Sequence, residues 1–207
     1  MRSLARTAVS AVALLSLLAC TGTKMVTTWR DPKYQPLPVK RVFIACVMSN
    51  DQAKVVFENA LAKALLDKGY LSATSTGVFV NDPVDKEKIT AFVRANQIDL
   101  VVVQRMIKHT ELAYLPGTLD YVPASAYYGG YWGAYGYGNG FSYTSAYVEE
   151  DTTVRTETTV YSTHSSPEVL VWSGASDTFN VQSALGGAQS LAKSLVTDLV
   201  KAGILVQ

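Results

Sequence analysis

The first half of the chain alternates between stretches with a strand pattern and stretches with a helix pattern. Residues 39–47 form a nearly continuous apolar run rich in β-branched and aromatic side chains, which is typical of a buried strand. Polar side chains at 49–51 can cap a helix at its start, and Gly69 can end it. Between them, apolar residues recur at helical spacing at Phe57, Leu61, Ala64 and Leu65. These positions predict a strand followed by a helix.

The same alternation continues as far as residue 107. Residues 70–76 can form the next strand, and Asp82 and Pro83 are typical of the start of a second helix. Residues 99–107 are again apolar at their centre and predict another buried strand. Strands that alternate with helices predict βαβ units, in which the crossovers make neighbouring strands parallel.

The pattern changes in the second half of the chain. Residues 149–163 and 168–175 are rich in β-branched side chains, and the turn residues at 165–167 between them predict a β-hairpin. A last helix is expected from about Asn180 to Gly203, with one apolar stripe at Leu191, Ala192, Leu195, Val196 and Leu199. The predicted class is α/β, with α+β as the alternative. We expect a two-layer mixed β-sheet with three helices, in the order βαβαβ, a hairpin and a C-terminal helix.

The first twenty residues carry the pattern of an export signal. Two arginines precede an apolar run that ends at Leu17, Leu18, Ala19 and Cys20. At about 1.5 Å per residue, this run is too short to span the ~30 Å hydrocarbon layer. The segment resembles the lipobox of bacterial lipoproteins, which implies cleavage before Cys20 and acylation of its thiol by chains such as palmitate. An ordinary signal peptide that contains a cysteine is the alternative.

A lipobox divides the chain into three expected parts. Residues 1–19 are a cleaved signal peptide, and residues 20–38 are a lipidated leader with three prolines, within which residues 26–29 can form a short edge strand. Residues 39–207 are a single α/β domain with a tyrosine- and glycine-rich loop at 112–147. Beyond the signal, no apolar stretch approaches the length of a membrane span.

The lipid anchor predicts the location of the protein. Two or three acyl chains at Cys20 would hold it to a bilayer, because each buried methylene contributes ~0.8 kcal/mol and one chain alone binds marginally. An Asp directly after the cysteine usually means retention at the inner membrane in Gram-negative lipoproteins, and here the residue is Thr21. By that resemblance we expect an anchor in the outer membrane with the domain facing the periplasm. In a Gram-positive source the anchor would lie in the cell membrane.

Charge and cysteine content narrow the classes of partner. Cleavage removes two of the 18 basic side chains and none of the 17 acidic ones, so the mature chain is slightly acidic. Because it also has no dense basic run, we expect no nucleic-acid partner. Cys46 lies within the apolar run at 39–47 and has no second cysteine to pair with once Cys20 is lipidated. It is expected to be a buried core thiol.

The segment between Asp120 and Glu149 contains no charged residue and many tyrosines and glycines. Its candidate binding residues are Tyr127, Tyr128, Tyr131, Trp132, Tyr135, Tyr137 and Phe141. Tyrosine offers a large apolar ring and a hydroxyl with little rotamer entropy to lose, which suits a contact surface for a protein, a glycan or the membrane interface. The alternatives are a passive low-complexity insertion and self-association through stacked β-prone segments.

The sequence contains no recognisable motif for nucleotide binding or for metal binding. The turn at 48–51 has no glycine with which to approach a nucleotide phosphate, and His109 and His164 have no second His or Cys at ligand spacing. Both histidines are expected at strand ends or turns. The acidic run at 149–151 is expected to be a solvated sheet edge rather than a calcium or glycan site. We therefore expect no catalytic residues, no metal and no cofactor.

The order of features resembles that of uncharacterised bacterial lipoproteins. The resemblance rests on residues 26–32, on the strand and helix that follow, and on Val171, Trp172, Ser173 and Gly174. The compact domain of those proteins is similar to the TolB amino-terminal and CsgG-like domains of envelope assembly. The tyrosine- and glycine-rich loop departs from those domains, so their partners do not transfer directly. We expect a non-enzymatic interaction or assembly module that offers the domain and its aromatic loop to an envelope partner in the periplasm. A module that binds cell-wall glycan through the aromatic loop is the alternative.

Overall fold

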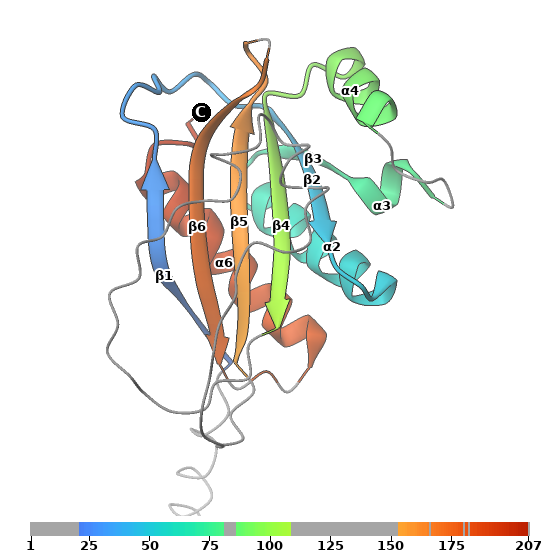
Figure 1. Ribbon diagram of the computed structural model, residues 1–207, viewed down its shortest axis with the longest axis vertical. Coiled ribbons are helices and arrows are strands. Elements are labelled where there is room, and N and C mark those ends of the chain that lie inside the picture. Colours follow the sequence, from blue (N-terminus) through green and yellow to red (C-terminus); the bar gives the residue numbers. More distant parts are fainter. Residues whose placement is uncertain are drawn as a thin grey trace, which may run out of the picture.

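The computed structural model describes residues 21–80, 86–108, 153–165, 167–179, 181 and 183–206. Its elements follow the order that the hydrophobic pattern predicts (Figure 1). They are β1 (Gly22–Arg30), β2 (Arg41–Val47), α2 (Asp51–Leu66), β3 (Leu71–Thr74), α3 (Ser75–Val78), α4 (Lys86–Ala95), β4 (Leu100–Lys108), β5 (Val154–Ser162), β6 (Val169–Phe179) and α6 (Ala184–Lys201). The mixed α/β class is confirmed. The part of the chain described here has four helices rather than the predicted three, because the single turn α3 follows β3 directly.

Six strands form one mixed sheet in the order β1-β6-β5-β4-β2-β3. β2 pairs in parallel with β3 and β4, as βαβ units require, whereas the β4–β5, β5–β6 and β1–β6 pairs are antiparallel. The predicted hairpin is therefore confirmed as β5 and β6. The edge strand expected at residues 26–29 is also present, and it is longer than predicted. It pairs with β6 from Gly22 to Arg30, which joins this part of the expected leader to the sheet.

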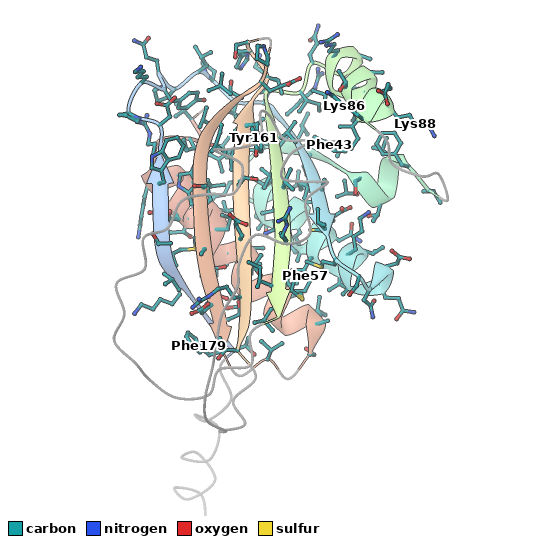
Figure 2. The ribbon with its side chains drawn as sticks, viewed as in Figure 1. Phe43, Phe57, Lys86, Lys88, Tyr161 and Phe179 are labelled. Atoms are coloured by element: carbon teal, nitrogen blue, oxygen red, sulfur yellow. The ribbon has the colours of Figure 1, made fainter. Side chains whose placement is uncertain are left out.

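Aromatic side chains fill a core on one face of the parallel half of the sheet. Phe43 of β2 lies 5.6 Å from Phe92 of α4 and 6.4 Å from Phe79, measured between ring centroids. Phe79 and Phe92 are 6.0 Å apart, in the edge-to-face range that aromatic rings favour. Figure 2 shows Phe43 and Tyr161 close together in this part of the sheet. This face is packed by α3 and α4, which add a partial layer to the predicted two.

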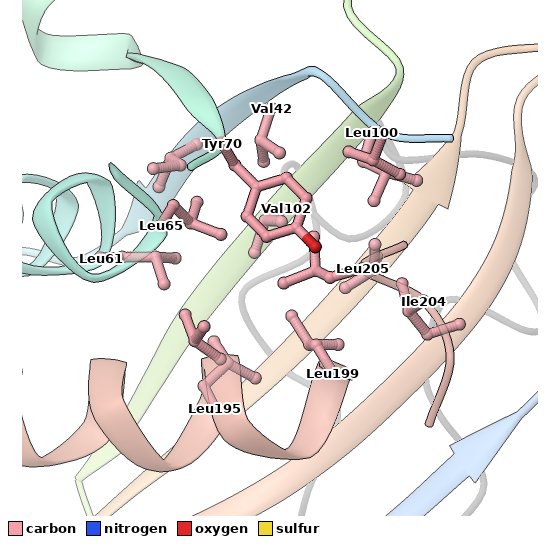
Figure 3. Close-up of a cluster of buried hydrophobic side chains, with 14 of the residues drawn as sticks. Val42, Leu61, Leu65, Tyr70, Leu100, Val102, Leu195, Leu199, Ile204 and Leu205 are labelled. Atoms are coloured by element: carbon pink, nitrogen blue, oxygen red, sulfur yellow. The ribbon is translucent and has the colours of Figure 1, made fainter. Parts of the chain in front are cut away.

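The larger core lies on the opposite face, between the sheet and the layer formed by α2 and α6 (Figure 3). Successive side chains of a strand point to opposite faces, so Val42 and Ile44 enter this core while Phe43 enters the other. The two helices contribute Leu61, Leu65, Leu195 and Leu199, all at most 1% exposed. Each such side chain stabilises the fold by about 1.5–3 kcal/mol when fully buried. The Tyr70 ring points into this core among Leu65, Val102 and Leu205 (Figure 3), and burial raises the pKa of its phenol.

The two long helices, α2 and α6, begin at polar capping residues and are each followed by a glycine. The Asn50 side chain accepts a hydrogen bond from the Ala53 N–H at 2.9 Å, which confirms a cap within 49–51. α6 begins at Ala184 rather than near residue 180, with Ser183 as its cap. Gly69 and Gly203 follow the helix ends with φ of 88° and 66°, a region that glycine enters without strain.

Candidate functional site: a groove between β1 and α6

A groove of about 640 Å³ runs between the edge strand β1 and helix α6. It is lined on one side by Thr21, which directly precedes β1, and by Thr23 and Met25 of β1; these side chains point to the same face because they alternate along an extended chain. The helix lines it with Gly186, Gln189, Ser190, Lys193, Ser194, Thr197, Asp198 and Lys201. The groove therefore presents hydroxyl, amide and ammonium groups along most of the length of α6.

The groove exists because α6 has a polar stripe beside its apolar one. Ser190, Ser194 and Thr197 recur at spacings of four and three, so they lie on one helical face. Thr23 Oγ1 donates to Ser190 Oγ at 2.9 Å, and Ser194 Oγ donates to the Thr23 carbonyl at 3.2 Å. Thr23 Oγ1 also lies 2.9 Å from Thr178 Oγ1 of β6. These bonds fix α6 against the edge of the sheet and leave the other polar groups to line the groove.

The charged side chains of the groove are Lys193, Lys201 and Asp198. Both lysines are exposed, and Asp198 is half-buried. Burial raises the pKa of the Asp198 carboxyl, and the nearby Lys201 ammonium partly opposes that shift. The groove as a whole therefore carries a slight positive charge at neutral pH.

One end of the groove is made by Thr21, the residue that follows Cys20. A Cβ added to Gly186 would lie 3.7 Å from Thr21 Oγ1, so the first turn of α6 lies directly against this threonine. Gly186 N–H also donates to the Ser183 cap at 3.1 Å. The start of β1 and the start of α6 thus lie together at the same end of the domain (Figure 1).

A second groove of about 620 Å³ lies between α2 and α6 on the outer side of the helix layer. Its floor is apolar, with Val56, Ala60, Ala64, Leu185 and Val196. Lysines border it at Lys63, Lys68 and Lys193, and Lys63 pairs with Asp67 at 3.1 Å on the exposed surface. Both grooves are lined by Gln189, Lys193 and Thr197, so the two grooves lie next to each other along α6.

A buried carboxylate that the sequence analysis did not identify lies behind β2. Glu58 of α2 is completely buried and accepts four hydrogen bonds. One oxygen accepts from the Cys46 N–H at 2.9 Å and from Ser75 Oγ at 2.6 Å. The other accepts from the N–H and the hydroxyl of Thr76 at 2.8 and 2.6 Å. Because a carboxylate has about four acceptor positions, Glu58 is saturated and joins α2, β2 and α3.

Cys46 is a buried core thiol, as predicted. It is 1% exposed, and its Sγ donates to Gln104 Oε1 at 3.3 Å. Burial raises the pKa of the Cys46 thiol well above its usual range, and the nearby Glu58 carboxylate raises it further. The thiol is therefore held in its protonated, unreactive form.

Asp99 and Asp177 are carboxylates that link neighbouring segments of the sheet. Asp99 accepts from the N–H groups of Lys40 and Arg41 at 2.8 and 2.9 Å, and its other oxygen lies 3.7 Å from His164 Nε2. His164 lies in the turn after β5, as predicted. Arg155 and Asp177 form a bidentate pair across β5 and β6, with both N–O distances at 2.7 Å. Within the residues described here, no three His, Cys, Asp or Glu side chains gather as metal ligands would.

Several predicted residues lie outside the part of the chain that the structure describes. These are the signal at residues 1–19, Cys20, the acidic run at 149–151, His109 and the candidate loop residues Tyr127, Tyr128, Tyr131, Trp132, Tyr135, Tyr137 and Phe141. Among the helices that are described, none is both long and apolar enough to cross a membrane. The turn at 48–51 is described, and it serves as the start of α2.

No protein-family model and no curated protein matches the chain. Among solved structures, it is similar to the PelC dodecamer from Paraburkholderia phytofirmans, with 11% identity over 90% of this chain and 99% of that chain and a TM-score of 0.46. It is also similar to lipoprotein GNA1162 from Neisseria meningitidis, with 15% identity over 78% of this chain and 99% of that chain and a TM-score of 0.39. The resemblance to TolB amino-terminal and CsgG-like domains is not shown by these findings and stays a prediction.

Proposed function

We propose that this protein is a lipid-anchored envelope protein that acts as a non-enzymatic interaction or assembly module on the periplasmic face of the outer membrane. One observation carries the proposal. β1 begins at Gly22, so only Thr21 separates the sheet from the expected lipidation site at Cys20. Successive Cα atoms are about 3.8 Å apart, so the sheet begins within about 8 Å of the anchored residue. The anchor then holds the domain directly against the bilayer.

The groove between β1 and α6 is the surface that we assign to a partner. It starts at Thr21 and extends along α6, so a partner bound there would be held beside the membrane. β1 is an edge strand, and extended peptides commonly bind beside an edge strand that a helix flanks. The lysines of the groove favour a partner segment that carries acidic groups.

Site-specific photo-crosslinking in cells tests this assignment. A photoreactive residue at Lys201, an exposed position that lines only this groove, is expected to give one defined crosslinked envelope protein. The same residue at Lys86, exposed at the start of α4 and outside the groove, is the control and should not give that product. Cys20→Ala should abolish the Lys201 product, because the domain is no longer held at the membrane. Identical products from both positions, or none from Lys201, would contradict the assignment.

A second candidate function is binding of cell-wall glycan. The observation that favours it is the lining of the groove, because hydroxyl, amide and ammonium groups are the donors and acceptors that sugar hydroxyls require. The aromatic loop remains the other predicted glycan site. Sedimentation with purified peptidoglycan separates the two sites. Asp198→Ala with Lys201→Ala, which line only the groove between β1 and α6, should prevent co-sedimentation if that groove binds glycan. Trp132→Ala with Tyr135→Ala should do so if the loop binds it. If neither pair changes co-sedimentation, glycan binding is wrong for both sites.

A further inference from the structure

The groove between α2 and α6 is long, and apolar side chains in it are open to solvent. Val55 of α2 and Leu185 of α6 line the groove and are 40% and 55% exposed. Ala60 and Ala64 lie one turn apart on α2, and their small side chains allow another chain to approach this helix closely. From Leu185 to Thr197 the lining residues extend over about 18 Å of α6, at about 1.5 Å per residue. The groove therefore matches about three turns of a helix.

Positively charged side chains lie on both sides of the apolar floor. Lys63 and Lys68 border it on the α2 side and Lys193 on the α6 side, and all three are exposed. Asp67, which pairs with Lys63, is the only carboxylate among the described residues that line the groove. The whole chain has nearly equal numbers of basic and acidic side chains, so the groove is a local excess of positive charge. A complementary ligand carries acidic groups on both sides of an apolar stripe.

An amphipathic helix with acidic flanks has this pattern, and such helices commonly bind apolar grooves through their apolar stripe. An acyl chain carries its charge at one end only, and a bilayer surface is flat, so neither matches a groove with lysines on both sides. Among the helices described here, α2, α4 and α6 bury their apolar residues in the cores of their own domain, for example Leu61, Ile89 and Leu195. The helix that fits the groove therefore comes from another protein.

We propose that the groove between α2 and α6 binds an amphipathic helix of a partner protein, with the apolar stripe of that helix on the floor. Its acidic residues face Lys63 and Lys68 on one side and Lys193 on the other. This surface is separate from the groove between β1 and α6, to which the proposed function assigns an extended segment. The inference does not depend on the lipid anchor.

A model peptide tests the surface. The probe is a fluorescein-labelled helix of about 14 residues, or about 21 Å, with leucines at spacings of three and four and glutamates on both flanks. Fluorescence anisotropy follows its binding to the full chain, as cells process it, in phosphatidylcholine nanodiscs, and empty nanodiscs give the blank. A chain that proves to be unlipidated is used in buffer. A peptide with lysines in place of the glutamates should bind at least about tenfold more weakly.

Charge reversal locates the binding site. Lys63→Glu with Lys68→Glu, which line only this groove, should weaken binding of the acidic peptide at least about tenfold, because two attractions become repulsions. Lys33→Glu with Lys86→Glu is the matched control, since both lysines are exposed outside the two grooves, and it should change the affinity by less than about twofold.

An apolar substitution tests the floor independently of charge. Leu185→Ser should weaken binding at least about threefold, because about half of this side chain is available for burial against the peptide. Leu71→Ser, 57% exposed at the start of β3 and outside the groove, is its control and should leave the affinity unchanged. Circular dichroism melting checks that each variant is folded. If the Lys63 and Lys68 variant melts at a lower temperature, the comparison of Leu185→Ser with Leu71→Ser decides.

Three outcomes would overturn the inference: no binding of the acidic peptide, equal binding of the acidic and basic peptides, or equal losses in a groove variant and its control. Lys201→Glu tells the two grooves apart, because Lys201 lines only the groove between β1 and α6. A loss as large as that of the Lys63 and Lys68 variant would place the peptide in that other groove and also overturn the inference. A defined product crosslinked at Lys201 in cells, together with no peptide binding, would refute the helix site and leave the proposed function standing.

Discussion

Replacing Glu58 with glutamine turns one oxygen of the buried carboxylate into an NH₂ group at almost constant volume. Each oxygen of Glu58 accepts one backbone N–H and one hydroxyl. The hydroxyls of Ser75 and Thr76 can rotate, but the N–H groups of Cys46 and Thr76 cannot. In either orientation of the amide, its NH₂ group therefore meets a backbone N–H, which is the buried one of Cys46 or the partly buried one of Thr76. A hydrogen bond to a charged acceptor contributes about 1.5–3 kcal/mol and an unsatisfied buried donor costs about 1–3 kcal/mol, so we expect a loss of about 3 kcal/mol in the free energy of unfolding.

Urea denaturation followed by far-ultraviolet circular dichroism measures this loss. Glu87→Gln is the matched control, because Glu87 is exposed in the first turn of α4 and should change the free energy by less than about 0.5 kcal/mol. If the two variants unfold at the same urea concentration as the parent chain, the Glu58 network does not stabilise the junction of α2, β2 and α3.

Three further predictions concern the core, the sheet and the groove. Leu195→Ala should lower the free energy of unfolding by about 2–5 kcal/mol, whereas Val200→Ala on the same helix, 44% exposed, should change it little; urea denaturation compares them. Gly174→Ala should destabilise the sheet by about 1–3 kcal/mol in the same assay, because its Cβ would lie 2.5 Å from Cη2 of the buried Trp172. Asp198→Asn should raise stability at neutral pH. The pKa of Asp198 is raised in the folded state, so ionisation of this carboxyl disfavours folding as the pH rises above 3.8, the ordinary pKa of Asp. Melting temperatures at pH 3 and pH 7 should therefore show the gain only at pH 7. A lower melting temperature of the variant at pH 7 would contradict this prediction.

The elements that the sequence predicted well are those whose pattern is local. Phe57, Leu61 and Leu65 lie on the buried face of α2, and the cap at Asn50 and the stop at Gly69 are each set by one residue type. The parallel strands followed from the alternation of strands and helices. The boundaries were less accurate at polar ends, since β6 continues to Phe179 and β1 begins at Gly22, where threonines and a lysine alternate without a long apolar run.

The features that the sequence did not predict depend on distant partners. Glu58 lies within an ordinary helical pattern, and its donors on α3 are about 17 residues away. The groove needs Thr21 and Thr23 beside Ser190, Ser194 and Thr197, segments separated by most of the chain. The polar stripe of α6, beside its apolar stripe, was the one feature of the sequence that could have indicated the groove. That β1 forms the other wall of the groove follows only from the pairing of β1 with β6.

The lipid anchor at Cys20 can be tested by mass spectrometry of the mature N-terminal peptide, from the full chain made in Gram-negative cells. We expect a chain that begins at Cys20, carries acyl chains on that residue and enters the sheet at Gly22. A chain that begins elsewhere, or an unmodified Cys20, would show that the domain is not anchored by lipid.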